Sequence, residues 1–270
     1  MRESRKLPKV VILCGGRGTR LKEETEFRPK PLVRVGGMPI LWHIMKIYSH
    51  FGFRDFILCL GYKGEMIREY FLNFEEMTNN FTLDLRAKNR GKKRIIHHSK
   101  TPLEDWKITF VDTGQEAQTG ARIYRIREHV DNDKDFFLTY GDGVADIDLH
   151  MLLAYHRTMK KPVTVTGVHS RSVFGLIEHE RGLVRTFREK PKLVDVISGG
   201  FFVCTPEVFG YLNNEDSFIF EDKPLKTLAR KKRLALFTHE GFWYCMDNQK
   251  HVDELNRLWF SGKAPWKIWS

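Results

Sequence analysis

The sequence has few features of secreted, disulfide-linked or membrane-spanning proteins. Its 270 residues include only four cysteines, and no two of them form a C-x-x-C pair. This sparse usage argues against a disulfide framework or a structural zinc site and favours a reducing cytoplasm. No apolar run approaches the roughly 20 residues that a membrane span needs. Only five apolar residues, VVILC, follow the basic start of the chain, so we expect no signal peptide and a soluble, cytoplasmic protein.

The chain carries a formal net charge of +11 at pH 7, which its ligands should explain. Nucleic acid is one candidate, but the cations are scattered apart from short runs at 88–94 and 229–233, and no nucleic-acid-binding motif accompanies them. Small phosphorylated substrates explain the same charge equally well. A metal site at the adjacent His97 and His98 is disfavoured, because one histidine pair supplies too few ligands.

Apolar periodicity predicts a single α/β domain over residues 1–270. Residues 10–14 and 55–62 are expected to be buried strands, and amphipathic helices are expected at 39–52 and 64–74. This alternating order is typical of a Rossmann-like, mixed but mostly parallel sheet flanked by helices. Residues 79–112 contain short alternating segments around a turn, which predicts a small antiparallel β insertion.

Regular α/β order is expected to return after residue 112. We find no repeat, low-complexity segment or linker that would divide the chain. The expected later elements are helices at 120–130 and 147–160, strands at 135–142, 162–168, 176–180, 184–191, 198–204 and 234–247, helical segments at 206–212 and 221–233, and a closing helix at 250–262.

A glycine-rich loop, CGGRGTR, ends the first expected strand. Glycines let the backbone close on a ligand without Cβ clashes, and backbone N–H groups at such a turn bind anions. The spacing fits neither a P-loop nor a G-x-G-x-x-G dinucleotide motif. Thr19, Arg20 and Lys30 come next, and such side chains suit a triphosphate or a pyrophosphate. The loop alone could also be a tight strand-to-helix turn with solvated cations.

The string from Gly15 to Lys30, followed by PKPLVRVGGMPIL, resembles the sugar-phosphate nucleotidylyltransferases, whose signature is G-G-x-G-T-R-L, then P-K-P and G-x-P-I. VDTG, TYGDGVADID, REKP, GGFFV, GFWYCMD and GKAPWKIW follow in order and resemble the glucose-1-phosphate cytidylyltransferase branch. The resemblance runs from residue 9 to residue 270. It implies a nucleotide-diphospho-sugar transferase fold. It also implies transfer of a cytidylyl group from CTP to α-D-glucose 1-phosphate, giving CDP-glucose and pyrophosphate for deoxysugar or lipopolysaccharide O-antigen biosynthesis.

Two carboxylates are the candidate metal ligands. Asp142 follows an expected strand between two glycines, where a carboxylate faces the ligand crevice of an α/β sheet. Its GDG context matches the metal-binding motif of the family, and Asp247 matches the second family ligand. The resemblance therefore implies Mg²⁺ at Asp142 and Asp247. Without it, Asp247 would be interpreted as the N-cap of the closing helix, and Asp146 and Asp148 fit turn or cap roles.

The resemblance also implies the residues that bind the two substrates. Arg20, Lys30 and Asp142 would be catalytic, with Arg20 on the β- and γ-phosphates and Lys30 on the α-phosphate. No general base is needed, because the attacking phosphate oxygen is already ionised. The implied nucleotide-binding residues are Leu13, Cys14, Gly15, Gly16, Gly18, Thr19, Arg20, Lys30 and Arg122, and the implied sugar-phosphate-binding residues are Glu189, Lys190, Ser198, Gly199 and Gly200.

Three positions depart from the branch pattern and leave the substrates open. Ser198 replaces the usual Asn beside the sugar, Ala121 replaces a glycine in TGAR, and Asn248 replaces Thr after Asp247, where it could alter the metal geometry. The acceptor could therefore be another phosphorylated molecule, and the nucleotide could be UTP or dTTP. Two other classes of protein also fit the sequence, a non-catalytic sugar-nucleotide-binding subunit and a nucleic-acid-binding module. By analogy with the branch we expect a trimer-based homo-oligomer.

The aromatic residues receive a structural interpretation. Trp42, Tyr48 and the run from Phe242 to Tyr244 could form a stacking platform for a base. At helical and strand spacing, however, such side chains belong more often to the core.

Overall fold

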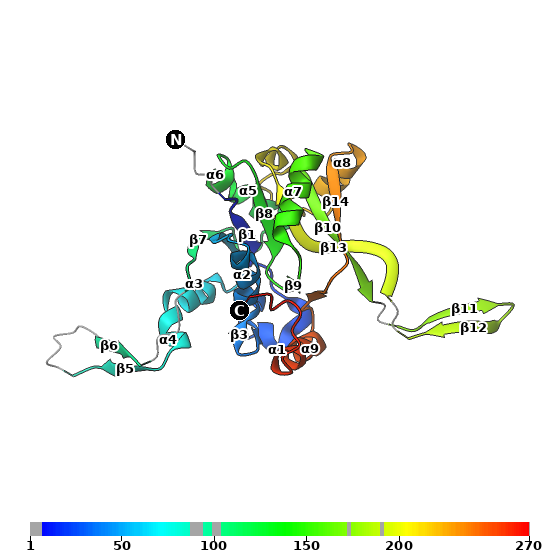
Figure 1. Ribbon diagram of the computed structural model, residues 1–270. Helices are drawn as coiled ribbons and strands as arrows, with labels where there is room; N and C mark the ends of the chain where they lie inside the picture. Colours follow the sequence, from blue (N-terminus) through cyan, green and yellow to red (C-terminus); the bar gives the residue numbers. More distant parts are fainter. Residues whose placement is uncertain (1–6, 87–93, 99–103, 172–173, 190–191, 270) are drawn as a thin grey trace.

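A seven-stranded sheet forms the centre of the computed structural model, which describes residues 7–86, 94–98, 104–171, 174–189 and 192–269 (Figure 1). The strand order is β14-β10-β13-β8-β1-β4-β7, and every pairing is parallel except those of β13 with β10 and β8. This confirms the expected mixed, mostly parallel sheet. The strands are β1 (Val10–Leu13), β4 (Asp55–Leu60), β7 (Lys107–Asp112), β8 (Phe136–Tyr140), β10 (Val163–Arg171), β13 (Lys192–Cys204) and β14 (Leu234–His239).

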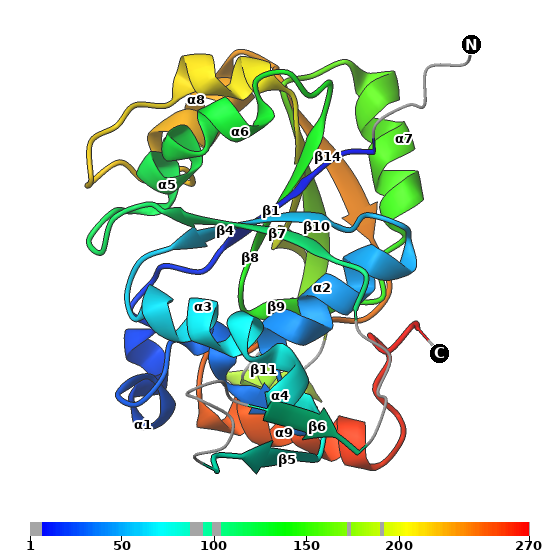
Figure 2. The ribbon, with the colours of Figure 1, turned by 90° about the vertical axis from the view of Figure 1, so that its left-hand side faces the viewer.

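Helices cover both faces of this sheet, so its central strands are buried on two sides (Figure 2). One apolar core lies under α2, α3, α7 and α9, and a second lies under α5, α6 and α8. All four residues of β1 are buried, which matches its continuous apolar sequence. The helices are α1 (Lys22–Thr25), α2 (Ile40–His50), α3 (Gly64–Leu72), α4 (Phe74–Thr78), α5 (Thr119–Arg125), α6 (Arg127–Val130), α7 (Leu149–Met159), α8 (Lys223–Arg230) and α9 (Gln249–Phe260).

Two antiparallel hairpins extend from opposite sides of the body (Figure 1). The first pairs β5 (Phe81–Asp84) with β6 (Arg94–His97), and the second pairs β11 (Leu176–Glu180) with β12 (Leu183–Arg188). The first hairpin confirms an antiparallel excursion, but its predicted end at residue 112 is wrong. β7 pairs in parallel with β4 as the edge strand of the main sheet. An edge strand is only half buried and therefore alternates in polarity, which made β7 resemble an antiparallel strand.

Two short strand pairs lie outside the main sheet, and one of them joins segments that are far apart in the sequence. β9 (Gly143–Ala145) pairs antiparallel with β15 (Trp243–Cys245), and the backbone N–H of Met246 donates to the carbonyl of Asp142 over 2.9 Å. β2 (Arg34–Val35) and β3 (Met38–Pro39) form a second short pair before α2. The β9–β15 pairing places two aspartates that are far apart in the sequence at the same edge.

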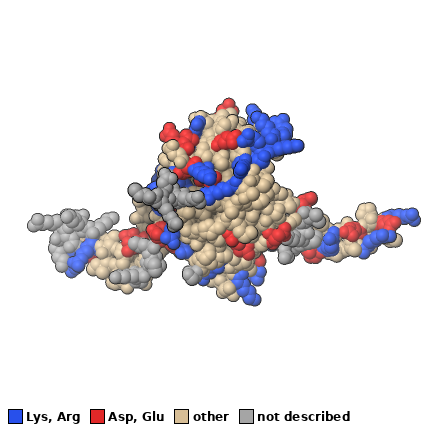
Figure 3. Space-filling model, turned by 45° about the horizontal axis from the view of Figure 1, so that its top comes forward, with Lys and Arg blue, Asp and Glu red and all other residues tan. Residues whose placement is uncertain are grey.

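Charge is unevenly distributed on the surface. Figure 3 shows Lys and Arg side chains gathered over one corner, where α8 lies, and both signs of charge interspersed elsewhere on that face. The cations of α8 and the turn after it are Lys223, Lys226, Arg230, Lys231, Lys232 and Arg233.

Among the described residues, no helix combines the length and the apolar character that crossing a membrane requires.

A buried histidine joins α2 to the C-terminal segment. His43 is fully buried; its Nε2 contacts the carbonyl of Val35 at 2.8 Å, and its Nδ1 accepts from Trp266 Nε1 at 3.3 Å. The rings of Trp259 and Trp266 meet the His43 ring edge-on, with centroids 4.7 and 6.1 Å away. Nε2 therefore carries the proton and Nδ1 is the acceptor, so the imidazole is neutral. The tryptophan-rich end of the sequence thus serves to close one core.

Protonation of His43 should destabilise the fold below neutral pH. Burial lowers the pKa of His43 from 6.5 to about 4, although the hydrogen bond to Val35 opposes this shift. As the pH falls, His43 binds a proton near pH 6.5 in the unfolded chain but only near pH 4 in the folded chain. The contribution of His43 to the free energy of unfolding is therefore fully present above pH 6.5, and it falls by about 3 kcal/mol between pH 6.5 and 4.

Urea denaturation at several pH values, compared with the His43→Gln variant, tests this prediction. The glutamine side chain offers a donor and an acceptor but does not titrate in this range, so the difference between the two proteins isolates the histidine from the carboxylates. A difference that stays constant between pH 7 and pH 4 would contradict the prediction.

Candidate active site

The glycine-rich loop begins where β1 ends and is held by both neighbouring strands. The N–H of Cys14 donates to the carbonyl of Cys59 over 3.0 Å, and the N–H of Gly141 donates to the carbonyl of Leu13 over 3.1 Å. Gly18 adopts a left-handed conformation with φ of 62°, which favours glycine. The loop and the segment after β8 therefore leave the same carboxyl edge of the sheet, where ligands bind in α/β folds.

The side chain of Arg122 holds this loop in place. Its side chain is buried, and its Nη2 donates to the carbonyl of Gly15 over 2.9 Å, while Nη1 donates to the carbonyls of Leu60 and Gly114 over 3.0 and 2.7 Å. A Cβ atom on Gly15 would lie 2.1 Å from Arg122 Nη1, so a larger residue would push the guanidinium away from its carbonyl partners. Burial lowers the pKa of this guanidinium, and nearby Cys59 and Cys14 partly offset the effect. Arg122 lines the first cavity, but it binds backbone carbonyls.

Lys30 lies between the two predicted metal ligands. Its ammonium donates to Asp142 Oδ2 over 2.7 Å and to Asp247 Oδ1 over 2.9 Å, and the second oxygen of Asp247 accepts from Arg20 Nη1 over 3.0 Å. Lys30 is 9% exposed. The structure thus brings together four of the predicted catalytic and metal-binding side chains, which come from three separate parts of the chain.

The charges in this cluster stabilise one another. Burial by itself would raise the pKa of Asp247, but the hydrogen bond and charge of Lys30, together with Arg20, lower it below its usual range. Burial would lower the pKa of Lys30, but Asp142 and Asp247 raise it above its usual value. Both partners therefore stay ionised at neutral pH, with the carboxylates available as cation ligands.

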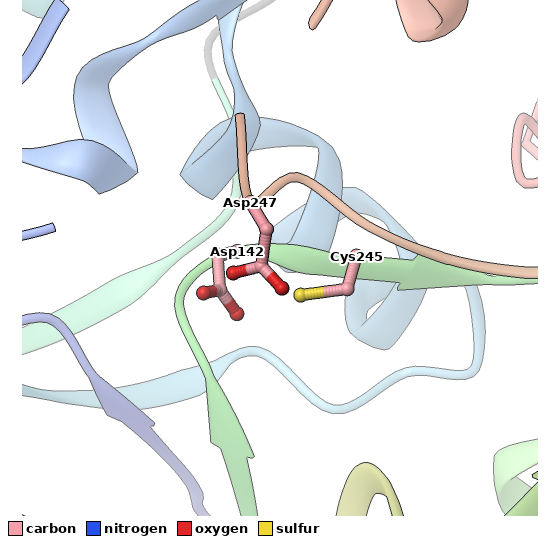
Figure 4. A group of neighbouring side chains, drawn as sticks. All are labelled: Asp142, Cys245 and Asp247. Atoms are coloured by element: carbon pink, nitrogen blue, oxygen red, sulfur yellow. The ribbon is translucent and has the colours of Figure 1, made fainter. Parts of the chain in front are cut away.

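The same carboxylates fit a divalent cation. They converge on one cationic position, which the Lys30 ammonium occupies, and hard carboxylate oxygens are the ligands that Mg²⁺ prefers. Cys245 adds a third potential ligand atom, and one such atom from each of the three side chains lies within 4.8 Å of the others (Figure 4). Burial and then the charges of Asp142 and Asp247 raise the pKa of the Cys245 thiol.

Two cavities meet at this cluster. The first has a volume of about 290 Å³ and the second of about 380 Å³. Arg20, Tyr140 and Asp142 line both, so the cavities adjoin at the carboxylate cluster. The first lies against the glycine-rich loop, and the second lies against β13 and β15. Such an arrangement can hold two ligands with their reacting ends at the same charged centre.

The first cavity contains nearly all residues predicted to bind the nucleotide. Thr19 is the exception, because it begins the turn that leads to α1 and does not line the cavity. Ala117, Gln118 and Thr119 also line this cavity. The predicted residues that line this cavity are Leu13, Cys14, Gly15, Gly16, Gly18, Arg20, Lys30 and Arg122.

The second cavity contains three of the five residues predicted to bind the sugar phosphate. Ser198, Gly199 and Gly200 line it, and Gly200 has φ of 78° with the Tyr140 ring 2.5 Å from where a Cβ would stand. Glu189 is exposed just after β12 and lines neither cavity. Lys190 lies outside the described residues.

Sequence reasoning missed several residues of the cavity walls. Glu221 accepts from the hydroxyl of Tyr140 and, over 2.5 Å, from that of Thr119. Thr119 lines the first cavity, Glu221 the second and Tyr140 both, so this bridge joins the two walls. Tyr140 could have been found from its place just before the GDG motif. Glu221 could not, because an acidic residue ahead of a helix resembles an ordinary surface residue.

Two of the aromatic residues that were expected in the core have different surroundings in the structure. Tyr48 is fully buried, as predicted. Trp243 packs against the core but also lines the second cavity, where its Nε1 donates to the carbonyl of Gly199 over 2.7 Å. The expected core packing is therefore confirmed for Trp243, which also shapes the cavity wall beside Ser198.

Asn248 has a structural role. Its side-chain oxygen accepts from the backbone N–H of His251 over 3.1 Å, which makes it the N-cap of α9. The N–H of Asp247 donates to His251 Nδ1 over 3.1 Å. Because Asn248 takes the cap position, the carboxylate of Asp247 points to Lys30 and not to the helix.

Comparisons with known proteins identify relatives of this chain. Two bacterial proteins are similar over nearly the whole chain. One, from Bacillus subtilis (strain 168), is named "Probable glucose-1-phosphate cytidylyltransferase"; it is 47% identical over 261 residues, which cover 97% of this chain and 100% of that protein. The glucose-1-phosphate cytidylyltransferase of Salmonella typhi is 46% identical over 262 residues, covering 97% of this chain and 99% of that protein.

Solved structures share the fold at lower identity. The crystal structure of HddC from Yersinia pseudotuberculosis superimposes with a TM-score of 0.67 at 20% identity, covering 94% of this chain and 100% of that one. Residues 9–248 match the sequence profile described as nucleotidyl transferase. The matched region begins just before β1 and includes the glycine-rich loop, Lys30, Asp142 and Asp247. The chain belongs to the nucleotidyl transferase family.

Proposed function

We propose that the protein transfers a cytidylyl group from CTP to α-D-glucose 1-phosphate, producing CDP-glucose and pyrophosphate. Two adjoining cavities that share Asp142 and Arg20 support a reaction between two anionic substrates. The high identity to proteins named as glucose-1-phosphate cytidylyltransferases supports the choice of CTP and glucose 1-phosphate. A homo-oligomer and a cytoplasmic location stay predictions from the family resemblance.

CTP binds in the first cavity. The backbone N–H groups of the loop from Gly15 to Gly18 face the phosphates, and Arg20 neutralises the charge of the β- and γ-phosphates. The base lies between this loop and the wall at Gln118 and Thr119. Arg122 does not touch the nucleotide in this proposal. It positions the carbonyl of Gly15, and with it the loop that contacts the phosphates.

Glucose 1-phosphate binds in the second cavity. Ser198 donates to a sugar hydroxyl, and the Gly199–Gly200 backbone lets the sugar approach closely because no Cβ intervenes. The phosphate end points toward Arg20 and Asp142, which line both cavities. Glu189 and Lys190 complete the sugar-phosphate site in the family resemblance, and they stay predictions here.

The chemical step depends on position and charge. The acceptor phosphate oxygen attacks the α-phosphorus of CTP in line, the bond to the pyrophosphate oxygen breaks, and no proton has to be removed because the attacking oxygen is ionised. Lys30 transfers its hydrogen bonds from Asp142 and Asp247 to the α-phosphate. Asp142 and Asp247 would hold Mg²⁺, which would act as a Lewis acid and neutralise charge on the phosphates.

Pyrophosphate release tests the function directly. The protein is assayed with Mg²⁺ and each of CTP, UTP, dTTP and ATP, against glucose 1-phosphate and several other phosphorylated acceptors. Release with CTP and glucose 1-phosphate alone is the expected result. Release with CTP and another acceptor would support cytidylyl transfer but would identify a different acceptor substrate. CTP binding without release in any combination would contradict the enzyme and leave a nucleotide-binding protein.

Removing one metal-ligating charge should abolish most activity. We expect Asp247→Asn to lower kcat by about 10²- to 10³-fold, because the amide cannot neutralise or hold a cation as a carboxylate does. Asp148→Asn is the matched control. Asp148 caps α7 by accepting from Met151, and asparagine caps equally well, so its kcat should stay unchanged. Equal losses in both variants would contradict the assignment.

Ser198 should contribute to acceptor binding alone. We expect Ser198→Ala to raise the KM for glucose 1-phosphate about 5-fold, since a neutral hydrogen bond contributes about 1 kcal/mol, and to leave the KM for CTP unchanged. Steady-state kinetics with each substrate varied in turn provides the measurement. A change in the KM for CTP alone would place Ser198 on the nucleotide side and contradict the proposed arrangement.

A further inference from the structure

The carboxylate cluster contains a donor that a magnesium enzyme does not need. Cys245 presents its thiol beside Asp142 and Asp247, and one ligand atom of each lies within 4.8 Å of the other two (Figure 4). Sulfur is a poor ligand for Mg²⁺, which prefers oxygen, but a good one for Zn²⁺ and Cd²⁺. The group therefore combines two hard donors with one soft donor around a single position.

We propose that Cys245, Asp142 and Asp247 form a binding site for a thiophilic divalent cation, with Zn²⁺ as the natural occupant. Such a cation would compete with Mg²⁺ and inhibit the enzyme. The binding site rests on the geometry alone, and the inhibition rests on the proposed function.

Strand pairing fixes the position of the thiol. β15 pairs with β9 in a register that places Cys245 opposite Gly143, and Met246 donates to the carbonyl of Asp142 over 2.9 Å. Cys245 and Asp247 lie two residues apart on the same extended segment. The backbone therefore holds the three side chains together before any cation binds.

The distances require only small side-chain rotations. Zn–S bonds of about 2.3 Å and Zn–O bonds of about 2.0 to 2.2 Å place ligand atoms of a tetrahedral site roughly 3.3 to 3.6 Å apart. In the structure the three ligand atoms lie within 4.8 Å of one another. Water or a substrate oxygen completes the coordination. Binding releases the thiol proton to solvent and involves no oxidation or reduction.

The Lys30 ammonium bridges the two carboxylates of the site, so they already converge on a positive charge. The Lys30 ammonium lies 2.7 Å from Asp142 Oδ2 and 2.9 Å from Asp247 Oδ1. Zn²⁺ would displace this ammonium and replace one positive charge with two. It would then hold the carboxylates that the reaction needs, with a sulfur bond that Mg²⁺ cannot match.

Cadmium binding to the full chain tests the site without reference to activity. Cd²⁺ is used as a spectroscopic probe, because a thiolate bound to it absorbs in the ultraviolet through sulfur-to-metal charge transfer. We expect the band to saturate at one Cd²⁺ per chain. It should be absent in Cys245→Ser and retained in Cys204→Ala, which removes a buried core thiol instead. Cys245→Ala repeats the test if the serine variant unfolds.

Zinc affinity provides the quantitative readout. Competition with a chromophoric chelator should show at least about 10-fold weaker Zn²⁺ binding in Cys245→Ser and in Asp247→Asn than in the unaltered protein. Persistence of the cadmium band in Cys245→Ser, or equal zinc affinities, would overturn the site.

Inhibition is measured separately. The zinc concentration for half-inhibition is determined at saturating Mg²⁺, with each rate normalised to the same protein without zinc. It should rise at least about 10-fold in Cys245→Ser. A Cys245-dependent band without such a rise would refute competition and leave the site intact. A band from a protein inactive on all substrates would refute the proposed function and leave the site intact.

Discussion

The Lys30 ammonium between Asp142 and Asp247 is the interaction on which the rest of the site depends. It joins segments that lie 112 and 217 residues apart in the chain. Two carboxylates this close together would repel each other without a cation between them. A mostly buried ammonium would in turn be unstable without both partners. This contact therefore joins the segment at Lys30 to the end of β8 and to the β9–β15 pair, which backbone hydrogen bonds already hold together.

A second buried cation organises the neighbouring edge of the sheet. Arg122 binds carbonyls at the ends of β1 and β4 and just after β7, where parallel strands point their carbonyls in one direction. Carbonyls that lack a partner at such an edge would be costly to bury. Arg122 satisfies several at once and thereby shapes the loop at Gly15. Lys30 and Arg122 thus have different partners, because Lys30 contacts the carboxylates that we propose as cation ligands and Arg122 contacts the backbone that shapes the loop.

Most of the fold could be predicted from local patterns, but the connections between distant segments could not. Buried strands and amphipathic helices carry their periodicity in the sequence, and β1, α2 and α9 were found for that reason. β7 was misassigned because edge strands alternate as antiparallel strands do. The motifs located Lys30, Asp142 and Asp247, but their mutual contact follows from the β9–β15 register. Glu221 has functional neighbours only in three dimensions, so no spacing pattern revealed it. Cys245 lies two residues before Asp247, but it lies beside Asp142 only because β15 pairs with β9.

Charge balance explains how one cluster can serve both the resting and the loaded site. In the structure, Arg20 and Lys30 contribute two positive charges against two carboxylates, so the cluster is neutral without ligands. A nucleoside triphosphate brings strong negative charge, and a divalent cation is needed to keep the site balanced. In the proposed mechanism Lys30 then moves from the carboxylates to the phosphate, and the divalent cation balances the charge that it leaves behind. Because the ammonium keeps the two carboxylates together until that exchange, the cation ligands are preorganised, and little reorganisation is required when the substrates bind.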